Sequence, residues 1–232
     1  MLKKINPQIA ELLGAHIGDG TLYKTNRGVV WELRGSLDEK IYYIENITPL
    51  LESIFDIAFI SKFRNDGGNG VWGIQTSKKQ IINFFLDYEM PIGSKTYIAK
   101  IPKYIFDSNL DIQRSFIRGL FDTDGCLRFE KINSKSIYDY PKIEFGFASK
   151  ILRDNLKKLL DILEFRSYIW FDKHTSAYKL CLSGKKQLEK WIIEISPRNQ
   201  KHLNKYNLWK DQGFILPRSH NLVLRRSHNE SV

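Results

Sequence analysis

The spacing of hydrophobic and polar residues predicts a succession of helices and strands that occurs twice along the chain. Apolar residues at helical spacing predict a helix over about residues 7–19 and another over about 110–124. Each is followed by Asp-Gly and a strand, and then by a second strand, "VVWELRG" in one half and "KIEFGFA" in the other, with the alternation of a half-buried sheet. The pattern predicts an α+β protein built from two similar halves.

The remainder of each half contains a long helix, a hairpin and a last helix. Ser36 and Ser149 are suitable N-caps for "LDEKIYYIENITPLLESIF" and "KILRDNLKKLLDILEF", and Pro49 is expected to kink or split the first of these helices. The hairpins are "IAFISKFRNDGGNGVWGIQTS" and "RSYIWFDKHTSAYKLCLSG", and the last helices start at Ser77 and Gly184. Each half therefore has the order α-β-β-α-β-β-α.

Three sequence matches, in the same order and at nearly constant offset, indicate a tandem duplication. They are "LLGAHIGDGTL" with "IRGLFDTDGCL", "SKKQIINFF" with "GKKQLEKWI", and Pro91–Lys95 with Pro197–Lys201. We therefore predict a first repeat over residues 1–106, a second over 107–217, and a mobile basic tail over 218–232.

Composition narrows the class of protein. Lys and Arg outnumber Asp and Glu by 36 to 26, a net charge of +10, which favours a polyanionic partner, nucleic acid before acidic membrane. No apolar run is long enough to cross a bilayer, so no membrane partner is expected. The N-terminal segment does not resemble a signal peptide, and the two isolated cysteines suit a reducing compartment. We expect an intracellular protein, in the cytoplasm, nucleoid or an organelle matrix, that is not secreted.

The duplication pairs two acids at helix ends. Asp19 and Asp124 occupy the same place in the two repeats, whereas Asp122 has Ile17 as its counterpart and is interpreted as accessory or structural. A helix C-terminus carries partial negative charge, so an acid there is unfavourable unless a cation compensates it. This indicates a metal ion as the missing counter-charge.

Small residues give the two motif helices a face on which their backbones can approach closely. If the helices pack on this face, Asp19 and Asp124 emerge side by side at the same end. The small residues are Gly14, Ala15, Gly18, Gly119 and Thr123.

The stretches "LLGAHIGDG" and "IRGLFDTDG" resemble the paired motifs of the LAGLIDADG homing endonucleases, and the resemblance extends over residues 7 to 210. It implies a single-chain pseudo-dimer: a saddle of two antiparallel sheets over the DNA major groove, with the motif helices packed at the centre. It also implies a site-specific double-strand DNA endonuclease in which Asp19 and Asp124, with the adjacent Gly18 and Thr123, form the metal site. Lys95 and Lys201 fall where the family often carries a catalytic lysine.

The chemistry of the residues agrees with this resemblance. Hydrolysis of a phosphodiester needs an activated water and neutralised phosphate charge, and two carboxylates that hold divalent cations can supply both. Oxygen ligands favour Mg²⁺, for which Mn²⁺ can substitute. Two repeats in one chain predict a monomer that cuts double-stranded DNA at a long asymmetric site.

Base-reading side chains are expected on the strand faces opposite the apolar ones, with Arg to guanine, Gln to adenine and Glu to cytosine. Lys24 is expected to bind phosphate. The candidates are Tyr23, Lys24, Arg27, Glu32, Arg34, Lys62, Arg64, Gln75, Arg128, Glu144, Arg166, Tyr168 and Lys179.

Two alternatives stay open. One is a maturase that binds intron RNA, and the other is a non-catalytic DNA-binding regulator on the same scaffold, for which loss of a motif acid would be expected. An intein is not expected, because no splicing domain surrounds the repeats. Where some family members carry Gln or Arg after strand two, this chain has Gly35-Ser36 and Ala148-Ser149, and Lys40 and Arg153 are candidate substitutes.

Overall fold

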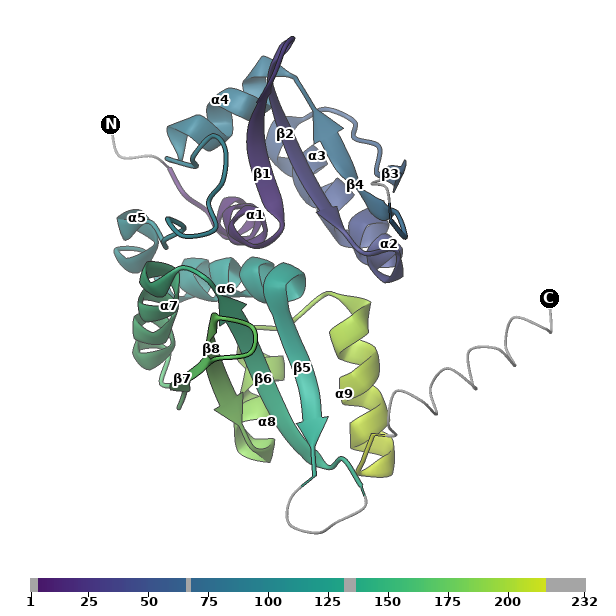
Figure 1. Cartoon of the computed structure of the whole chain (residues 1–232), viewed down its shortest axis with the longest axis vertical. Helices are drawn as coiled ribbons and strands as arrows, with labels where there is room; N and C mark the ends of the chain where they lie inside the picture. The colour runs from purple at the N-terminus through teal and green to yellow at the C-terminus, as the bar shows by residue number, and fades with distance from the viewer. Residues whose placement is uncertain (1–3, 66–67, 132–136, 216–232) are drawn as a thin grey trace, which may run out of the picture.

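Two four-stranded antiparallel sheets, one in each repeat, are joined through a central pair of helices (Figure 1). The structure is a computed structural model that describes residues 4–65, 68–131 and 137–215. In both sheets the strands lie in the order first, second, fourth, third along the chain, so the two sheets have the same topology. The predicted α+β fold is confirmed; the predicted tail over 218–232 lies outside the described residues.

The first repeat follows the predicted order of elements. It contains α1 (Pro7–Gly18), β1 (Gly20–Thr25), β2 (Gly28–Gly35), η1 (Leu37–Glu39), α2 (Lys40–Tyr42), η2 (Tyr43–Ile47), α3 (Thr48–Phe55), β3 (Lys62–Arg64), β4 (Val71–Thr76) and α4 (Lys79–Asp87).

The second repeat has the same order of elements, and the sequence pattern did not predict two further helices: α5 (Lys103–Phe106), just before this repeat, and α9 (Gln200–Gln212), at its end. The other elements are α6 (Leu110–Asp124), β5 (Gly125–Glu130), β6 (Tyr140–Phe147), α7 (Lys150–Ile162), β7 (Tyr168–Asp172), β8 (Ala177–Ser183) and α8 (Lys185–Glu194). None of the helices in the described part of the chain has the length and apolarity needed to cross a membrane.

The helix after β2 is neither split nor ended at Pro49, but its geometry changes in the turn just before it. Pro49 has no N–H, so it cannot bond the carbonyl four residues back as an α-helix requires. The turn just before it widens into the π-helical η2, in which the N–H of Thr48 reaches the carbonyl of Tyr43. The Thr48 hydroxyl donates to the same carbonyl at 2.8 Å. The helix therefore continues past the proline.

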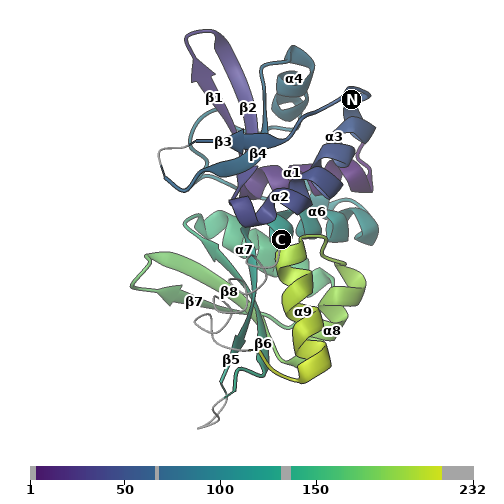
Figure 2. The ribbon, with the colours of Figure 1, turned by 90° about the vertical axis from the view of Figure 1, so that its right-hand side faces the viewer.

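Each sheet buries one face and leaves the other open. Trp31 and Leu33 of β2 are buried in the core, while the alternate residue Arg34 is exposed. In Figure 2 both sheets lie to the left of α3, α4, α8 and α9. The open faces of the two sheets consequently look to the same side of the molecule.

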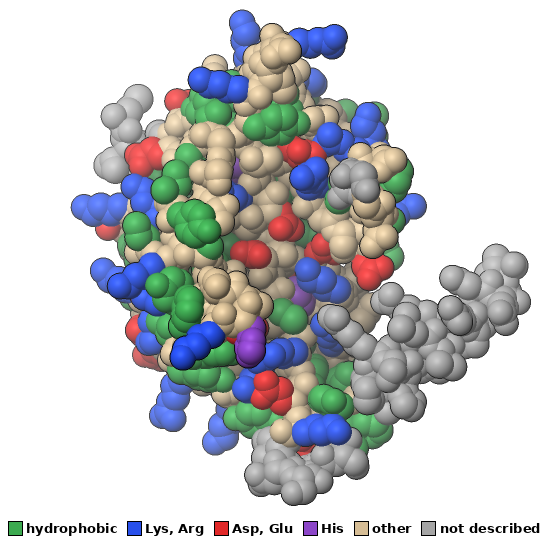
Figure 3. Space-filling view, in the orientation of Figure 1, with side chains coloured by type: hydrophobic (Ala, Val, Ile, Leu, Met, Phe, Trp, Pro, Cys, Tyr) green, Lys and Arg blue, Asp and Glu red, His purple; other side chains and the backbone are tan. Residues whose placement is uncertain are grey.

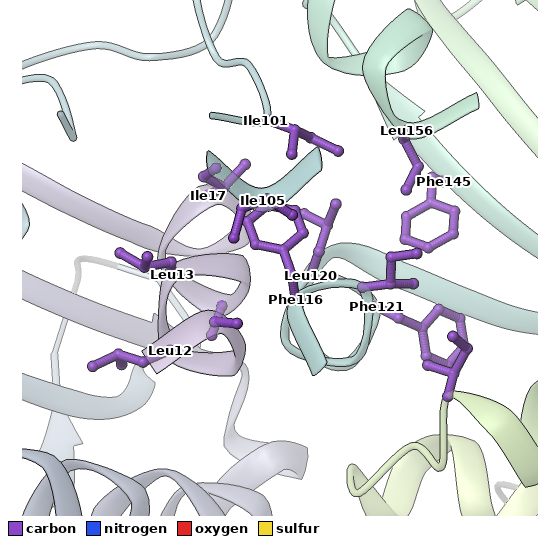
Figure 4. Packing of buried hydrophobic residues seen from close by; sticks show 14 of the residues in the cluster. Leu12, Leu13, Ile17, Ile101, Ile105, Phe116, Leu120, Phe121, Phe145 and Leu156 are labelled. Carbon is purple, nitrogen blue, oxygen red and sulfur yellow. The ribbon is translucent and has the colours of Figure 1, made fainter. Parts of the chain in front are cut away.

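The central helices α1 and α6 touch through their backbones. A Cβ atom on Gly14 would lie 2.0 Å from the carbonyl oxygen of Phe116, and one on Gly119 would lie 1.9 Å from that of Glu11. Only glycine fits at these two positions, as the small-residue face predicted. Around this contact, Leu12 and Leu13 point toward the first sheet (Figure 4).

The second sheet packs on the opposite side of this helix pair. The ring centroids of Phe121 on α6 and Phe145 on β6 lie 5.7 Å apart (Figure 4). The helix pair is thus covered by one sheet on each side, which holds the ends of α1 and α6 in place.

Candidate active site and nucleic-acid interface

The C-terminal ends of α1 and α6 lie side by side. Asp19 caps α1, its N–H donating to the carbonyl of Ala15 at 3.0 Å, and Asp124 is the last residue of α6. A Cβ atom on Gly18 would lie 2.1 Å from Thr123 Oγ1 and 3.2 Å from the Cβ of Asp124. The glycine therefore lets the acid of each repeat approach that of the other.

Negative charge accumulates at these helix ends. Burial raises the pKa of Asp19 to about 7, and the neighbouring carboxylates of Glu39 and Asp124 add to the rise. Although Asp124 reaches solvent, the protein around its carboxylate removes enough water to raise its pKa to about 6. Lys95 and Lys201 lower both pKa values in part, and a divalent cation would favour the ionised acids further.

The side chains alone do not complete a metal site. Within the described residues, no group of three or more His, Cys, Asp or Glu side chains is arranged to hold a metal ion. The hydroxyl of Thr123 is buried and donates to the carbonyl of Gly119 at 2.9 Å, so it is not directed at the acids. Mg²⁺ commonly keeps water and substrate phosphate oxygens among its ligands, and a site with two carboxylates fits that preference.

Lys95 lies in the loop after α4, and its Nζ donates to the carbonyls of His16 and, at 2.8 Å, Gly18. Burial lowers the pKa of Lys95 to about 8, against the opposing effect of Asp19 and Asp124. It lines a hollow of about 200 Å³ together with Asp124. A first-repeat lysine therefore faces the acid of the second repeat.

Lys201 has a different environment from Lys95. It lies in the first turn of α9, a helix whose N-cap, Asn199, accepts a 3.1 Å hydrogen bond from the N–H of Lys201. Its Nζ donates to Oε1 of Glu39 at 2.7 Å. The matched positions in sequence are thus not equivalent in contacts.

Glu39 is a residue that the sequence analysis missed. Its Oε2 accepts from the N–H of Ser36 at 2.9 Å, while its Oε1 accepts from Asn199 Nδ2 at 2.8 Å and from Lys201. The Ser-x-x-Glu capping box was a visible signal, but it predicts only a helix start. The position matching Glu39 in the second repeat is Leu152, so the carboxylate is present on one side of the site alone.

Asp122 is fully buried, as a structural residue would be. Its Oδ2 accepts from the N–H of Arg198 at 2.8 Å, and its own carbonyl accepts from Asn199 Nδ2 at 2.7 Å. Burial raises the pKa of Asp122 to about 7. These bonds join the end of α6 to the segment that carries Lys201.

The two candidate substitutes for the missing Gln or Arg are engaged elsewhere. Arg153 pairs with Asp154 at 2.5 Å and lies 4.3 Å from the ring centroid of Tyr178. Lys40 lies 4.7 Å from the ring centroid of Trp72.

Most of the candidate DNA-binding residues lie on the open faces of the two sheets, as the strand registers show. Three do not. Arg27 lies in the β1–β2 turn and Arg166 lies in the loop before β7, because the strands are shorter than the sequence pattern predicted. Lys24 lies at the exposed end of β1, on the same face of the sheet as the buried Leu22. Those on the open faces are Tyr23, Glu32, Arg34, Lys62, Arg64, Gln75, Arg128, Glu144, Tyr168 and Lys179.

On the side formed by the open sheet faces, acidic side chains lie near the centre and basic side chains lie around them. Figure 3 shows Asp and Glu side chains near the middle of this side, with Lys and Arg side chains around them. A polyanion on this side would meet positive charge along its length and carboxylates at its centre.

The family comparison matches the second repeat. The sequence model described as a LAGLIDADG-like domain matches residues 111–195. The fold matches solved structures over most of the chain. It resembles mesophilic variants of the homing endonuclease I-DmoI, with a TM-score of 0.59 and 19% identity over 83% of this chain and 97% of that one. It also resembles the I-LtrWI LAGLIDADG homing endonuclease bound to target DNA, with a TM-score of 0.60 and 15% identity over 88% and 90% of the two chains.

The second repeat therefore matches a LAGLIDADG-like domain, and the fold over most of the chain is that of solved LAGLIDADG homing endonucleases. Among curated proteins, it is 26% identical over 194 residues to the glutamine–fructose-6-phosphate aminotransferase of Methanocaldococcus jannaschii, covering 81% of this chain and 16% of the relative. It is 30% identical over 180 residues to the replication factor C small subunit of the same organism, covering 71% of this chain and 9% of the relative. The chain thus spans less than a fifth of either relative.

Proposed function

We propose that the chain is a site-specific DNA endonuclease that hydrolyses both strands of a duplex with the help of divalent metal. The observation that carries this proposal is the adjacency of Asp19 and Asp124 at the ends of two glycine-packed helices. Burial raises the pKa values of both carboxylates, so a divalent cation bound there would favour their ionised forms. A divalent cation bound there would polarise the scissile phosphate and lower the pKa of the attacking water.

The lysines are proposed to serve the same centre. Lys95 Nζ is fixed by two carbonyls at the end of α1, and Lys201 Nζ by Glu39. Each ammonium would offset the negative charge that grows on the phosphate during attack, an effect that is strongest when the donor is already held in place.

Structural relatives support the choice of substrate and metal. I-DmoI has been solved in complex with DNA and Mn, and I-LtrWI bound to target DNA. We propose that the open faces of both sheets lie against duplex DNA in the same way, with Mg²⁺ as the metal and Mn²⁺ as a substitute.

The curated relatives indicate that the aligned segment is a separate module, and that it does not carry the activities for which those relatives are named. The same stretch of about 200 residues aligns with an aminotransferase and with a replication factor subunit, and it forms a small part of each. Two proteins with unrelated names cannot owe their activities to one shared segment. We therefore propose none of those activities for this chain.

A selection followed by a cleavage assay tests the proposed function. Duplexes that bind are selected from a random double-stranded library without Mg²⁺ or Mn²⁺, and are then incubated with each cation. We expect one enriched sequence and metal-dependent cutting of both strands. Absence of duplex enrichment, or equal cutting in EDTA, would contradict the proposal.

A further inference from the structure

Each open sheet face carries a buried glutamate at the same place. Glu32 on β2 lies opposite Thr21 of β1 and Gln75 of β4. Glu144 on β6 lies opposite Cys126 of β5 and Cys181 of β8. The side chains of Glu32 and Glu144 are only 5% and 10% exposed, although other side chains on the same faces, such as Arg34 and Tyr168, are exposed.

Both carboxylates are bound by an arginine, and the arginines come from different strands. Glu32 pairs with Arg64 of β3, the last strand of the first sheet. Glu144 pairs at 2.7 Å with Arg128 of β5, the first strand of the second sheet, and Arg128 also pairs with Glu130 of the same strand at 2.9 Å. Lys179 Nζ also approaches Glu144 at 3.3 Å. The arginines reach solvent, with side chains 25% and 38% exposed.

These contacts change what the glutamates can do. A glutamate that turned toward a base would give up its ion pair with the arginine, and at Arg128 only the pair with Glu130 would remain, so the change is costly. The guanidinium, by contrast, has five N–H donors in a rigid fork. Arg64 uses Nη1 for Glu32, and Arg128 uses Nη2 for both Glu144 and Glu130, so each arginine still has donors on its other nitrogens for another partner. That fork matches the O6 and N7 acceptors of guanine in the major groove.

We propose that Glu32 and Glu144 are positioning residues that hold Arg64 and Arg128 to read guanine, and that neither glutamate reads a base itself. This inference rests on the proposed binding of duplex DNA to the open faces. It replaces the sequence-based expectation that these glutamates select cytosine.

The arrangement also makes the reading asymmetric. By strand register, the position that matches Arg64 in the second repeat is Asp172, and the position that matches Arg128 in the first repeat is Tyr23. The two matching glutamates therefore bind arginines that lie on opposite edges of their sheets. The two guanines should therefore lie at different distances from the centre of the target.

Binding selection with paired variants tests the assignment. We compare Arg128→Lys, Glu144→Gln and the double variant with the unmodified chain, on random duplexes without Mg²⁺ or Mn²⁺. Each variant should lose about tenfold or more of the preference for guanine at one and the same base pair. The double variant should lose no more than either single variant, because both act through one guanidinium.

The control removes an equal charge elsewhere. Glu189→Gln on α8, where Glu189 lies 3.9 Å from Lys185, should leave every base preference unchanged. Arg64→Lys and Glu32→Gln repeat the test in the other sheet, should a variant of the first pair fail to fold. The proposed pairing would be overturned if the arginine and glutamate variants lost base preference at different base pairs. It would also be overturned if a glutamate variant lost a preference for cytosine read by that glutamate. A chain that selects no duplex at all would instead contradict the proposed function.

Discussion

Lys201 of the second repeat donates a 2.7 Å hydrogen bond to Glu39 of the first repeat, across 162 positions of sequence. Lys95, its sequence match, is held by backbone carbonyls and lines the same hollow as Leu152, the residue that matches Glu39 in sequence. The duplication therefore produced two helix ends that are similar in sequence and unequal in their surroundings.

Glu39→Gln should slow single-turnover cleavage about tenfold to a hundredfold while changing DNA affinity little, because Lys201 loses the carboxylate that holds it near the acids. Lys201→Met should have the same effect, and the double variant should be no slower than the slower single. Lys95→Met should slow cleavage independently of Glu39. Rapid-quench kinetics with each strand labelled separately would measure these effects. If the lysine variants weaken only binding, with a shallower salt dependence, the lysines contact phosphate instead.

Asp19→Asn and Asp124→Asn should each reduce cleavage at least about a hundredfold and keep DNA affinity within a few-fold. The amide preserves shape but removes the charge that a divalent cation requires. Filter binding and single-turnover cleavage in Mg²⁺ and Mn²⁺ measure the two effects. Full activity of the double variant would show that these acids do not hold the metal.

The pH dependence of stability should report the same two acids. Their pKa values rise from 3.8 to about 7 and about 6 on folding, so between about pH 4 and pH 7 the folded state binds more protons than the unfolded state. The free energy of unfolding contributed by these groups falls as pH rises through that range, and the loss is complete above the folded pKa values. Relative to the Asp19→Asn, Asp124→Asn variant, the metal-free protein should be less stable at pH 8 than at pH 4.5.

Thermal melts of both proteins measure this difference. Adding Mg²⁺ should raise the Tm of the unmodified protein more at pH 8 than at pH 5, because only the ionised acids bind the cation. The amide variant serves as the control and should show little response to Mg²⁺ at either pH. An equal response of both proteins would rule out metal binding by this pair.

Gly119→Ala should destabilise the chain by at least about 1–3 kcal/mol, because the new Cβ would lie 1.9 Å from the carbonyl oxygen of Glu11 and the two helix backbones would have to separate. Gln8→Ala, at an exposed position of α1, is the matched control and should be close to neutral. Urea unfolding followed by circular dichroism measures both. A near-neutral Gly119→Ala variant would mean that the helix contact is looser than the structure shows.

One chain should cut both strands of an asymmetric site. Two identical surfaces would read a palindrome, but here the half-faces differ, since Arg34 opposes Gly73 in the first sheet whereas Gly146 opposes Lys179 in the second. The mass of the protein–DNA complex and a titration of active sites measure the stoichiometry. Two chains per cleaved site, or a preference for palindromes, would contradict this prediction.

The sequence by itself determined the features that arise from short-range interactions. Helical and strand periodicities, the N-cap at Ser149 and the proline effect at Pro49 each depend on residues within a few positions of one another. The duplication then identified Asp19 and Asp124 as a pair, since the same motif recurs with the same acid. That information sufficed for the α+β class, the order of elements and the packing of the motif helices.

Only the tertiary structure decided the contacts between distant segments. It placed Glu39 against Lys201, docked α9 beside the site, and buried Glu32 and Glu144 under arginines from other strands. No short stretch of sequence predicts these pairings. The partner of each side chain depends on how the two repeats and their strands pack together. Sequence periodicity assigns a residue to a face of a sheet, but burial and ion pairing on that face determine whether its charge is free to meet a ligand.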